Sequence, residues 1–136
     1  MNYLDSWVWL EYVLGGPAEE RAGEVLDTAH ADGGVTSAIS ISEIGYVVRR
    51  ELGQEMADFV TSSIDDAEPI RVVPVTSDIA YRASGIRTKY YSRRDRELSY
   101  ADAIQIATAI HEECDVIHTG DTDFEELDEV ATRIHR

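Results

Sequence analysis

The chain has 136 residues, 43% of them hydrophobic, and is long enough to fold as one globular domain over residues 1–136 with its own core. Acidic residues outnumber basic ones by 27 to 12, which gives a formal net charge of -15. This charge excludes nucleic-acid binding through the overall field of the molecule, because phosphate binding normally rests on Lys and Arg. Any such binding would depend on how the few basic residues are distributed.

Three features of the sequence indicate the compartment and the kind of organism. The single Cys114 excludes an intramolecular disulfide and a cysteine-rich zinc site. No basic signal region opens the chain, and its apolar runs are far shorter than the ~20 residues of a membrane helix. All basic residues except Lys89 are arginines, which together with the acidity resembles proteins of halophilic archaea. We expect a cytoplasmic protein from such an organism, with a mature chain that begins near residue 1.

Short apolar segments alternate with helical patterns along the whole chain. In chain order, the predicted elements are a strand at 1–5, helices at 5–14 and 18–32, a strand at 34–38, helices at 40–52 and 54–64, a strand at 70–75, a helix from 76 into the basic segment 87–97, a helix at 98–114, a strand at 115–121, a short helix at 122–127 and a strand at 130–135. This alternation predicts an α/β fold with a parallel sheet covered by helices on both faces.

Four carboxylates fall at or near the start of a predicted helix, most of them just after a strand: Asp5, Glu43, Asp102 and Asp121. In an open α/β sheet such junctions lie at the carboxyl ends of the strands, where ligand sites form. Helix capping is the alternative for each acid, since acids favour helix starts. The capping-box pattern is matched by three pairs, Ser40 with Glu43, Ser99 with Asp102, and Thr122 with Glu125.

A shared cation would explain why acids stand in apolar surroundings. Asp102 shares a helix stripe with Ile106 and Ala109, and Asp5 follows Leu4, so both carboxylates are expected to point inward. Buried carboxylates that lie close together are forced to protonate unless a cation is present. Ligands that are all oxygen suit Mg²⁺ or Mn²⁺. The four histidines show no zinc-ligand spacing.

The chain resembles the PIN-domain family of small metal-dependent nucleases, and most closely its VapC-type toxins. The resemblance is carried, in chain order, by YLDSWVWLEY, SAISISEIGYVV, LSYADAIQIATA and VIHTGDTDFEEL. It implies a three-layer α/β/α fold with a short central parallel sheet, and one or two Mg²⁺ or Mn²⁺ ions held by Asp5, Glu43, Asp102 and Asp121. Asp123 is the second choice for the fourth ligand. Ser6 and Thr119 would orient the carboxylates, and Phe124 would anchor the short helix in the core.

The resemblance also implies an activity and partners. The activity is hydrolysis of RNA phosphodiester bonds by a metal-activated water, which makes the chain an endoribonuclease and the toxin of a VapBC-type toxin-antitoxin pair. Helices near the amino terminus would receive a cognate antitoxin, and subunits would form a homodimer. The alternatives are a PIN-type RNA-processing nuclease without an antitoxin, and a catalytically silent PIN-like domain that binds RNA or protein.

Half of the basic residues fall within fifteen positions, among tyrosines. Arginine and tyrosine together can grip phosphates and stack on unpaired bases. The basic residues expected to contact RNA are Arg87, Lys89, Arg93, Arg94 and Arg96. The alternative is a solvated helix face whose basic residues pair with acids elsewhere in the chain.

Overall fold

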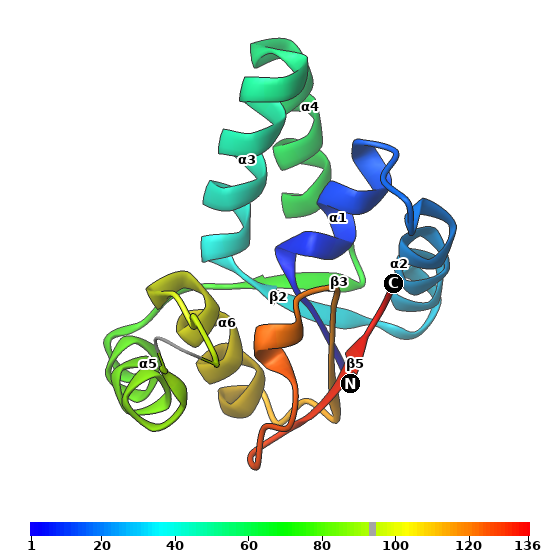
Figure 1. Cartoon of the computed structure of the whole chain (residues 1–136). Helices are drawn as coiled ribbons and strands as arrows, with labels where there is room; N and C mark the ends of the chain where they lie inside the picture. Colours follow the sequence, from blue (N-terminus) through cyan, green and yellow to red (C-terminus); the bar gives the residue numbers. More distant parts are fainter. Residues whose placement is uncertain (93–94) are drawn as a thin grey trace.

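The computed structural model describes residues 1–92 and 95–136 (Figure 1). In chain order the elements are β1 (Asn2–Leu4), α1 (Ser6–Val13), α2 (Glu19–Asp32), β2 (Gly34–Ser37), α3 (Ala38–Leu52), α4 (Gln54–Asp65), β3 (Ile70–Val73), α5 (Ser77–Tyr90), α6 (Tyr100–His111), β4 (Val116–Thr119), the short 3-10 helix η1 (Thr122–Phe124) and β5 (Ala131–Ile134). All of the predicted strands and helices are present, so the α/β prediction is confirmed.

The strands form one parallel sheet in the order β3-β2-β1-β4-β5. The chain builds the sheet outward from β1 through β2 to β3, and then returns to the other side of β1 for β4 and β5. Because parallel crossovers are right-handed, this reversal places the later helices on the opposite face from the earlier ones. The direction in which strands are added to the sheet therefore reverses between β1 and β4. Open α/β sheets bind ligands at such a switch point.

Two hydrophobic cores lie on the two faces of the sheet, and neighbouring residues of β1 point into different ones. Tyr3 belongs to the core beneath α5 and α6, together with Ile106 and Phe124. Leu4 belongs to the core beneath α1, α2, α3 and α4, together with Ile44. This alternation is the two-residue period of a strand that is buried on both faces. The predicted three-layer α/β/α arrangement is confirmed, and so is Phe124 as a core anchor.

The start of one helix differs from the prediction. The third helix begins at Ala38 and not at Ser40, because the Ser37 side chain accepts a hydrogen bond from the backbone N–H of Ile39 at 3.1 Å and caps the helix there. The fully buried Ser40 is thus an internal helix residue.

In the described part of the chain, no helix combines the length and the apolar character that crossing a bilayer requires.

Candidate active site

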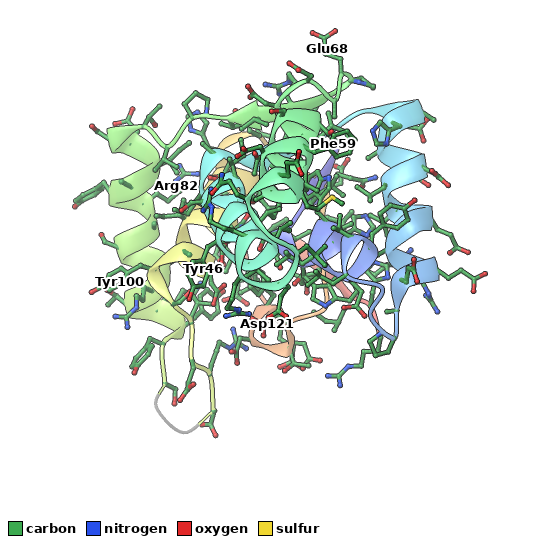
Figure 2. All side chains as sticks on the ribbon, turned by 90° about the horizontal axis from the view of Figure 1, so that it is seen from above. Tyr46, Phe59, Glu68, Arg82, Tyr100 and Asp121 are labelled. Carbon is green, nitrogen blue, oxygen red and sulfur yellow. The ribbon has the colours of Figure 1, made fainter. Side chains whose placement is uncertain are left out.

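The acids predicted from sequence are placed by four different elements. Asp5 directly follows β1, and Asp121, labelled in Figure 2, follows β4 two residues after its end. Since β1 and β4 are neighbours, these two acids flank the switch point of the sheet. Glu43 lies in the second turn of α3, and Asp102 lies in the first turn of α6. Elements far apart in sequence therefore bring their acids to the same end of the sheet.

Thr119 links the two acids at the switch point. Its hydroxyl donates to Oδ2 of Asp5 at 2.7 Å and accepts from the backbone N–H of Asp121 at 3.1 Å. Asp5 is only 5% exposed, so this hydrogen bond orients a carboxylate that water scarcely reaches. The Ser6 hydroxyl lies between Asp5 and Glu43, at 3.5 Å from Oδ1 of Asp5 and 3.3 Å from Oε1 of Glu43. Both hydroxyls expected beside the acids therefore contact them.

Glu43 is held by a glutamine that the sequence interpretation did not single out. Gln105 is fully buried, and its Oε1 accepts from the hydroxyls of Tyr3 and Ser40, the latter at 3.0 Å. With Oε1 engaged by two O–H donors, the amide nitrogen faces Glu43 and donates to its Oε1 at 2.9 Å. The one signal in the sequence was a glutamine within the otherwise apolar stretch that follows Asp102.

Only one of the three capping boxes expected from sequence forms. The Ser99 hydroxyl accepts from the N–H of Asp102 at 3.0 Å, and Oδ2 of Asp102 accepts from the N–H of Ser99 at 3.1 Å. The box of Ser40 with Glu43 is wrong, because that helix begins earlier. The box of Thr122 with Glu125 is also wrong, because Asp121 precedes η1 and accepts from the N–H of Asp123 at 2.8 Å.

All four acids have raised pKa values. Burial, together with the charges of Glu43 and Asp102, raises the pKa of Asp5 to about 7, although the Thr119 hydrogen bond opposes this. Burial, with smaller contributions from Asp121 and Glu43, raises the pKa of Asp102 to about 6. Burial is also the main cause of the raised pKa of Glu43 and of Asp121. The acids therefore sense one another's charge and form one electrostatic cluster.

The acidic cluster lacks basic partners. Among residues 1–92 and 95–136, no ion pair joins any of its four carboxylates to Lys, Arg or His. Within the same residues, three of its oxygens accept no hydrogen bond, namely Oε2 of Glu43, Oδ1 of Asp102 and Oδ2 of Asp121. Unbonded carboxylate oxygens without a positive neighbour are the donor set that a hard divalent cation takes. The chemistry of the cluster thus fits such an ion.

The side chains are not gathered into a closed coordination shell. In the part of the chain that is described, no group of three His, Cys, Asp or Glu side chains is close enough together to hold a metal ion. Asp102 is turned toward its own helix start by the Ser99 cap, and Glu43 is turned toward Gln105. Binding of a cation would therefore require the carboxylates to rotate toward one another.

The turn that carries Asp121 depends on a close contact between Gly120 and Trp7. A side-chain carbon added at Gly120 would overlap the indole ring of Trp7, so only glycine fits beneath this ring. Trp7 comes from α1, directly after Ser6. The same indole is stacked on His135, at 6.2 Å between ring centroids. The β4 turn and the start of α1 thus fix each other's position beside the acids.

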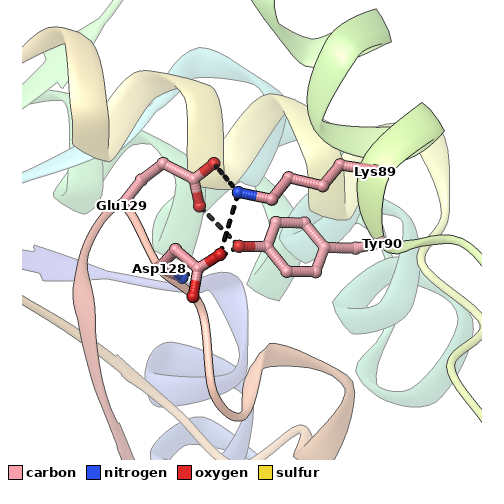
Figure 3. Close-up of polar contacts among 4 residues, drawn as sticks. All are labelled: Lys89, Tyr90, Asp128 and Glu129. Carbon is pink, nitrogen blue, oxygen red and sulfur yellow. Dashed lines mark hydrogen bonds and ion pairs between the residues drawn. The ribbon is translucent and has the colours of Figure 1, made fainter.

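Within the basic segment, Lys89 is paired with acids. Its ammonium group lies 3.0 Å from Oδ2 of Asp128 and 3.0 Å from Oε2 of Glu129, and the Tyr90 hydroxyl donates to Glu129 at 2.6 Å (Figure 3). These contacts raise the pKa of Lys89 and lower that of Glu129. The positive charge of Lys89 is therefore largely balanced within the chain.

Arginine and tyrosine do come together in this segment, as the sequence indicated. The guanidinium of Arg87 lies 4.3 Å from the ring centroids of both Tyr91 and Tyr100, and its Nε donates to the carbonyl of Leu98 at 3.1 Å. Arg96 lies over the ring of Tyr90, 5.0 Å from its centroid. The contacts of Arg87 connect α5 to the start of α6, the helix that carries Asp102.

Two of the residues predicted to contact RNA, Arg93 and Arg94, lie outside the described residues. The remaining three predicted contacts are Arg87, Lys89 and Arg96. All three have partners within the chain, of which those of Lys89 are acidic.

Comparisons with known proteins agree with this architecture. A family model described as the PIN domain matches residues 3–130. The chain is similar to VapC20 of Mycobacterium tuberculosis, described as a toxin that cleaves the sarcin-ricin loop, with 22% identity, a TM-score of 0.77 and coverage of 98% of this chain and 99% of that one. It is also similar to FitAcB of Neisseria gonorrhoeae, with 26% identity, a TM-score of 0.72 and coverage of 97% and 96%.

A further similar structure is the DNA-bound VapBC of Salmonella typhimurium, with 17% identity, a TM-score of 0.75 and coverage of 98% of this chain and 96% of that one. No curated protein sequence matches the chain. The family match spans nearly the whole sequence, including the four acids at the end of the sheet. The chain therefore belongs to the PIN-domain family.

Proposed function

We propose that this chain is a metal-dependent endoribonuclease, built as one nuclease domain over residues 1–136, and the toxin of a toxin-antitoxin pair in the cytoplasm. The observation that supports this best is the acidic cluster, in which four carboxylates with raised pKa values lack basic partners among the described residues. Keeping like charges together is costly unless a cation is bound. Membership of a nuclease family, and similarity to solved toxin-antitoxin proteins, point to the same activity.

The proposed ligands are Asp5, Glu43, Asp102 and Asp121, with Asp123 as the second choice for the fourth. When bound, Mg²⁺ or Mn²⁺ lowers the pKa of a water nucleophile and stabilises the charge that develops on the phosphoryl oxygens. Thr119 and Ser6 orient the carboxylates through their hydroxyls. Gln105 opposes the rise in the pKa of Glu43 that burial causes, since its N–H donates to the carboxylate.

RNA is proposed to reach the cluster along the segment 87–97, which runs up to α6. Tyr100 is 70% exposed at the first position of α6, two residues before Asp102, and its ring can stack on an unpaired base. Arg87 is held against this ring, so its charge lies beside the proposed base contact. The internal pairing of Lys89 means that Arg87 and Arg96 contribute more to phosphate binding than Lys89 does.

An apolar groove gives the proposed antitoxin a docking surface. It has a volume of about 200 Å³ and lies among α1, α2 and α4, with Trp9, Tyr12 and Phe59 in its lining. Phe59, labelled in Figure 2, is 68% exposed, which is unusual for so large an apolar side chain. Similar structures include toxin-antitoxin complexes, among them one from Klebsiella pneumoniae. A second copy of the chain is proposed as a further partner, forming a homodimer.

Cleavage of RNA by the purified protein tests the proposed activity. Structured and unstructured RNAs are incubated with Mg²⁺, with Mn²⁺ or with EDTA, and fragments are separated on gels. We expect cleavage only with a divalent cation, and a loss of about a hundredfold or more in Asp102→Asn, which removes the charge of one proposed ligand. The matched control is Asp27→Asn, which changes an exposed acid of α2 and should cleave normally.

Two outcomes would favour the alternatives. Full cleavage by a well-folded Asp102→Asn protein would remove the acidic cluster from the mechanism. Binding of RNA without cleavage under every metal condition would favour a catalytically silent domain. The antitoxin is tested separately, by asking whether the upstream reading frame encodes a small DNA-binding protein that co-purifies with this chain and inhibits it.

A further inference from the structure

A second site is indicated by a groove beside the edge strand β5. The groove has a volume of about 430 Å³ and lies between α2 and the strands β4 and β5. The side chains that matter for its chemistry are Arg21 and Glu24 of α2, His118 of β4, Arg133 of β5, and His135 just after β5. None of these residues belongs to the acidic cluster, and the contact between the two is the backbone carbonyl of His118, which accepts from the N–H of Asp5 at 3.0 Å.

Two arginines of the groove are left without acidic partners. Neither Arg21 nor Arg133 forms an ion pair within 4.0 Å among residues 1–92 and 95–136, in a chain that has 27 acidic residues. Their charges act on the same place, because both contribute, after burial, to the lowered pKa of His135. The groove is therefore a local region of positive potential in an acidic protein.

The two histidines add one N–H donor to this region. Nδ1 of His118 and Nε2 of His135 share a hydrogen bond of 3.0 Å, and the rings are stacked. If His118 donates, the proton of His135 is on Nδ1, and if His135 donates, the proton of His118 is on Nε2. Either tautomer leaves one N–H outside the shared bond. His135 is only 4% exposed and its Nδ1 is a buried atom, so the N–H that a ligand in the groove can reach is that of His118 Nε2.

These features fit an anion better than a metal ion. The charges of Arg21 and Arg133 repel a cation, and the facing nitrogens of the two imidazoles are engaged with each other. Two guanidinium groups and an imidazole N–H are instead the donors that recognise phosphate oxygens. Glu24 lies in the same lining and offers an acceptor for hydroxyl groups, as a carboxylate does for ribose.

We propose that the groove between α2 and β5 binds a phosphate group, either as free phosphate or as the monoester of a hydroxylated compound. Arg21 and Arg133 bind the phosphate oxygens, and the His118–His135 pair donates one further hydrogen bond. Glu24 accepts from hydroxyl groups next to the phosphate, which favours the monoester over the free ion. The volume of the groove leaves space for a sugar beside the phosphate.

Calorimetric titration of the whole chain tests this site. Inorganic phosphate, ribose 5-phosphate and ribose are titrated at constant ionic strength with EDTA, so that no divalent cation can bind phosphate at the acidic cluster. We expect both phosphates to bind and ribose not to bind. Arg21→Ala and Arg133→Ala should each weaken phosphate binding by about tenfold or more, as expected when a charged hydrogen-bond donor is removed.

A matched control shows whether an effect is specific to the arginines of this groove. Arg71→Ala removes an arginine that is paired with Glu112 outside the groove, and it should bind phosphate like the parent protein. Arg21 and Arg133 are exposed, so their replacement should leave the circular dichroism spectrum unchanged.

The outcomes assign the ligand or overturn the site. Tighter binding of ribose 5-phosphate, lost in Glu24→Gln, supports the monoester, whereas equal affinity for the two phosphates supports free phosphate as the ligand. The proposal is overturned if neither phosphate binds, or if both bind equally well to Arg21→Ala and Arg133→Ala. RNA cleavage is not needed for any of these results, so the site stands or falls independently of the proposed nuclease.

Discussion

Burial and the neighbouring acids both raise the pKa of Asp5. The pKa of this carboxyl group is raised to about 7, so the folded protein without metal keeps a proton that the unfolded chain releases near pH 4. The stability of the metal-free fold should therefore fall as the pH rises from about 4 to about 7 and stay low above that range. The shift corresponds to a cost of about 4 kcal/mol at most.

The variant Asp5→Asn should remove this cost, since a neutral amide still accepts the Thr119 hydrogen bond. In EDTA at pH 8 we expect the variant to be more stable than the parent by about 2 kcal/mol, which is roughly 5–10 °C in melting temperature for a chain of this size. At pH 4 the two proteins should melt at nearly the same temperature. Added Mg²⁺ should stabilise the parent and not the variant.

Thermal melting followed by circular dichroism between pH 4 and pH 8 provides the measurement. The exposed-acid variant Asp27→Asn is the control and should follow the parent at every pH. If the melting temperature of Asp5→Asn also followed that of the parent at every pH, the ionised carboxylate of Asp5 would not destabilise the fold. A cation would then have no unfavourable charge to neutralise at this position.

The individual site residues differ in how well the sequence could predict them. Asp5 and Asp102 stand out because a carboxylate beside apolar residues violates the usual pattern of burial. Tyr3 does not stand out, and Gln105 does so only as a glutamine in an apolar stretch, because their roles come from hydrogen bonds across elements that are far apart in sequence. A single sequence carries no signal for such a contact, even where the contact decides which way a proposed metal ligand points.

At the scale of the elements, strands and helices were predictable where a periodic apolar pattern and a turn signal agreed. The starts of helices were less predictable, because several side chains near a start can serve as the cap. Ser37 and Ser40 both precede apolar helical positions, yet Ser37 caps α3 and Ser40 is buried within it. The choice depends on where β2 ends, which the register of the sheet determines and local sequence does not.

The buried polar network around Gln105 connects α6 to β1 and α3. Replacing Gln105 by Leu would leave the hydroxyls of Tyr3 and Ser40 without their shared acceptor, and Glu43 without its amide donor. A buried polar group that loses its partner costs about 1–3 kcal/mol, so we expect Gln105→Leu to lower the free energy of unfolding by that amount. RNA cleavage should fall further than this loss of stability explains, because Glu43 is no longer oriented.

Two measurements separate the loss of stability from the loss of cleavage. Urea unfolding gives the free energy of unfolding, and cleavage rates are measured at a temperature where the variant is fully folded. Gln54→Leu, an exposed glutamine on α4, is the control and should change both quantities little. A Gln105→Leu protein that is destabilised but cleaves RNA at the parent's rate would restrict the network to a structural role.

At the scale of the whole molecule, the net charge of -15 is spread over a surface with few internal ion pairs. Among the described residues, the ion pairs of Lys and Arg side chains involve only Arg50, Arg71 and Lys89. Most of the 27 acids therefore repel one another across the surface with little compensation. The folded state brings these charges closer together than the unfolded chain does, so folding is opposed by repulsion that salt can screen.

We expect the melting temperature to rise strongly with salt, since the Debye length falls from roughly 10 Å at 0.1 M to roughly 3 Å at 1 M. Melting curves in KCl from about 0.1 M to about 2 M measure this effect. A variant with three exposed acids of α2 beyond its first turn made neutral, Glu24→Gln, Asp27→Asn and Asp32→Asn, should be more stable than the parent at low salt and depend less on salt. Because screening acts on charge and not on the apolar cores, the two curves should converge at high salt. If the parent and the variant instead rose in parallel, salt would be acting through the cores, and repulsion between surface acids would not limit the stability of this fold.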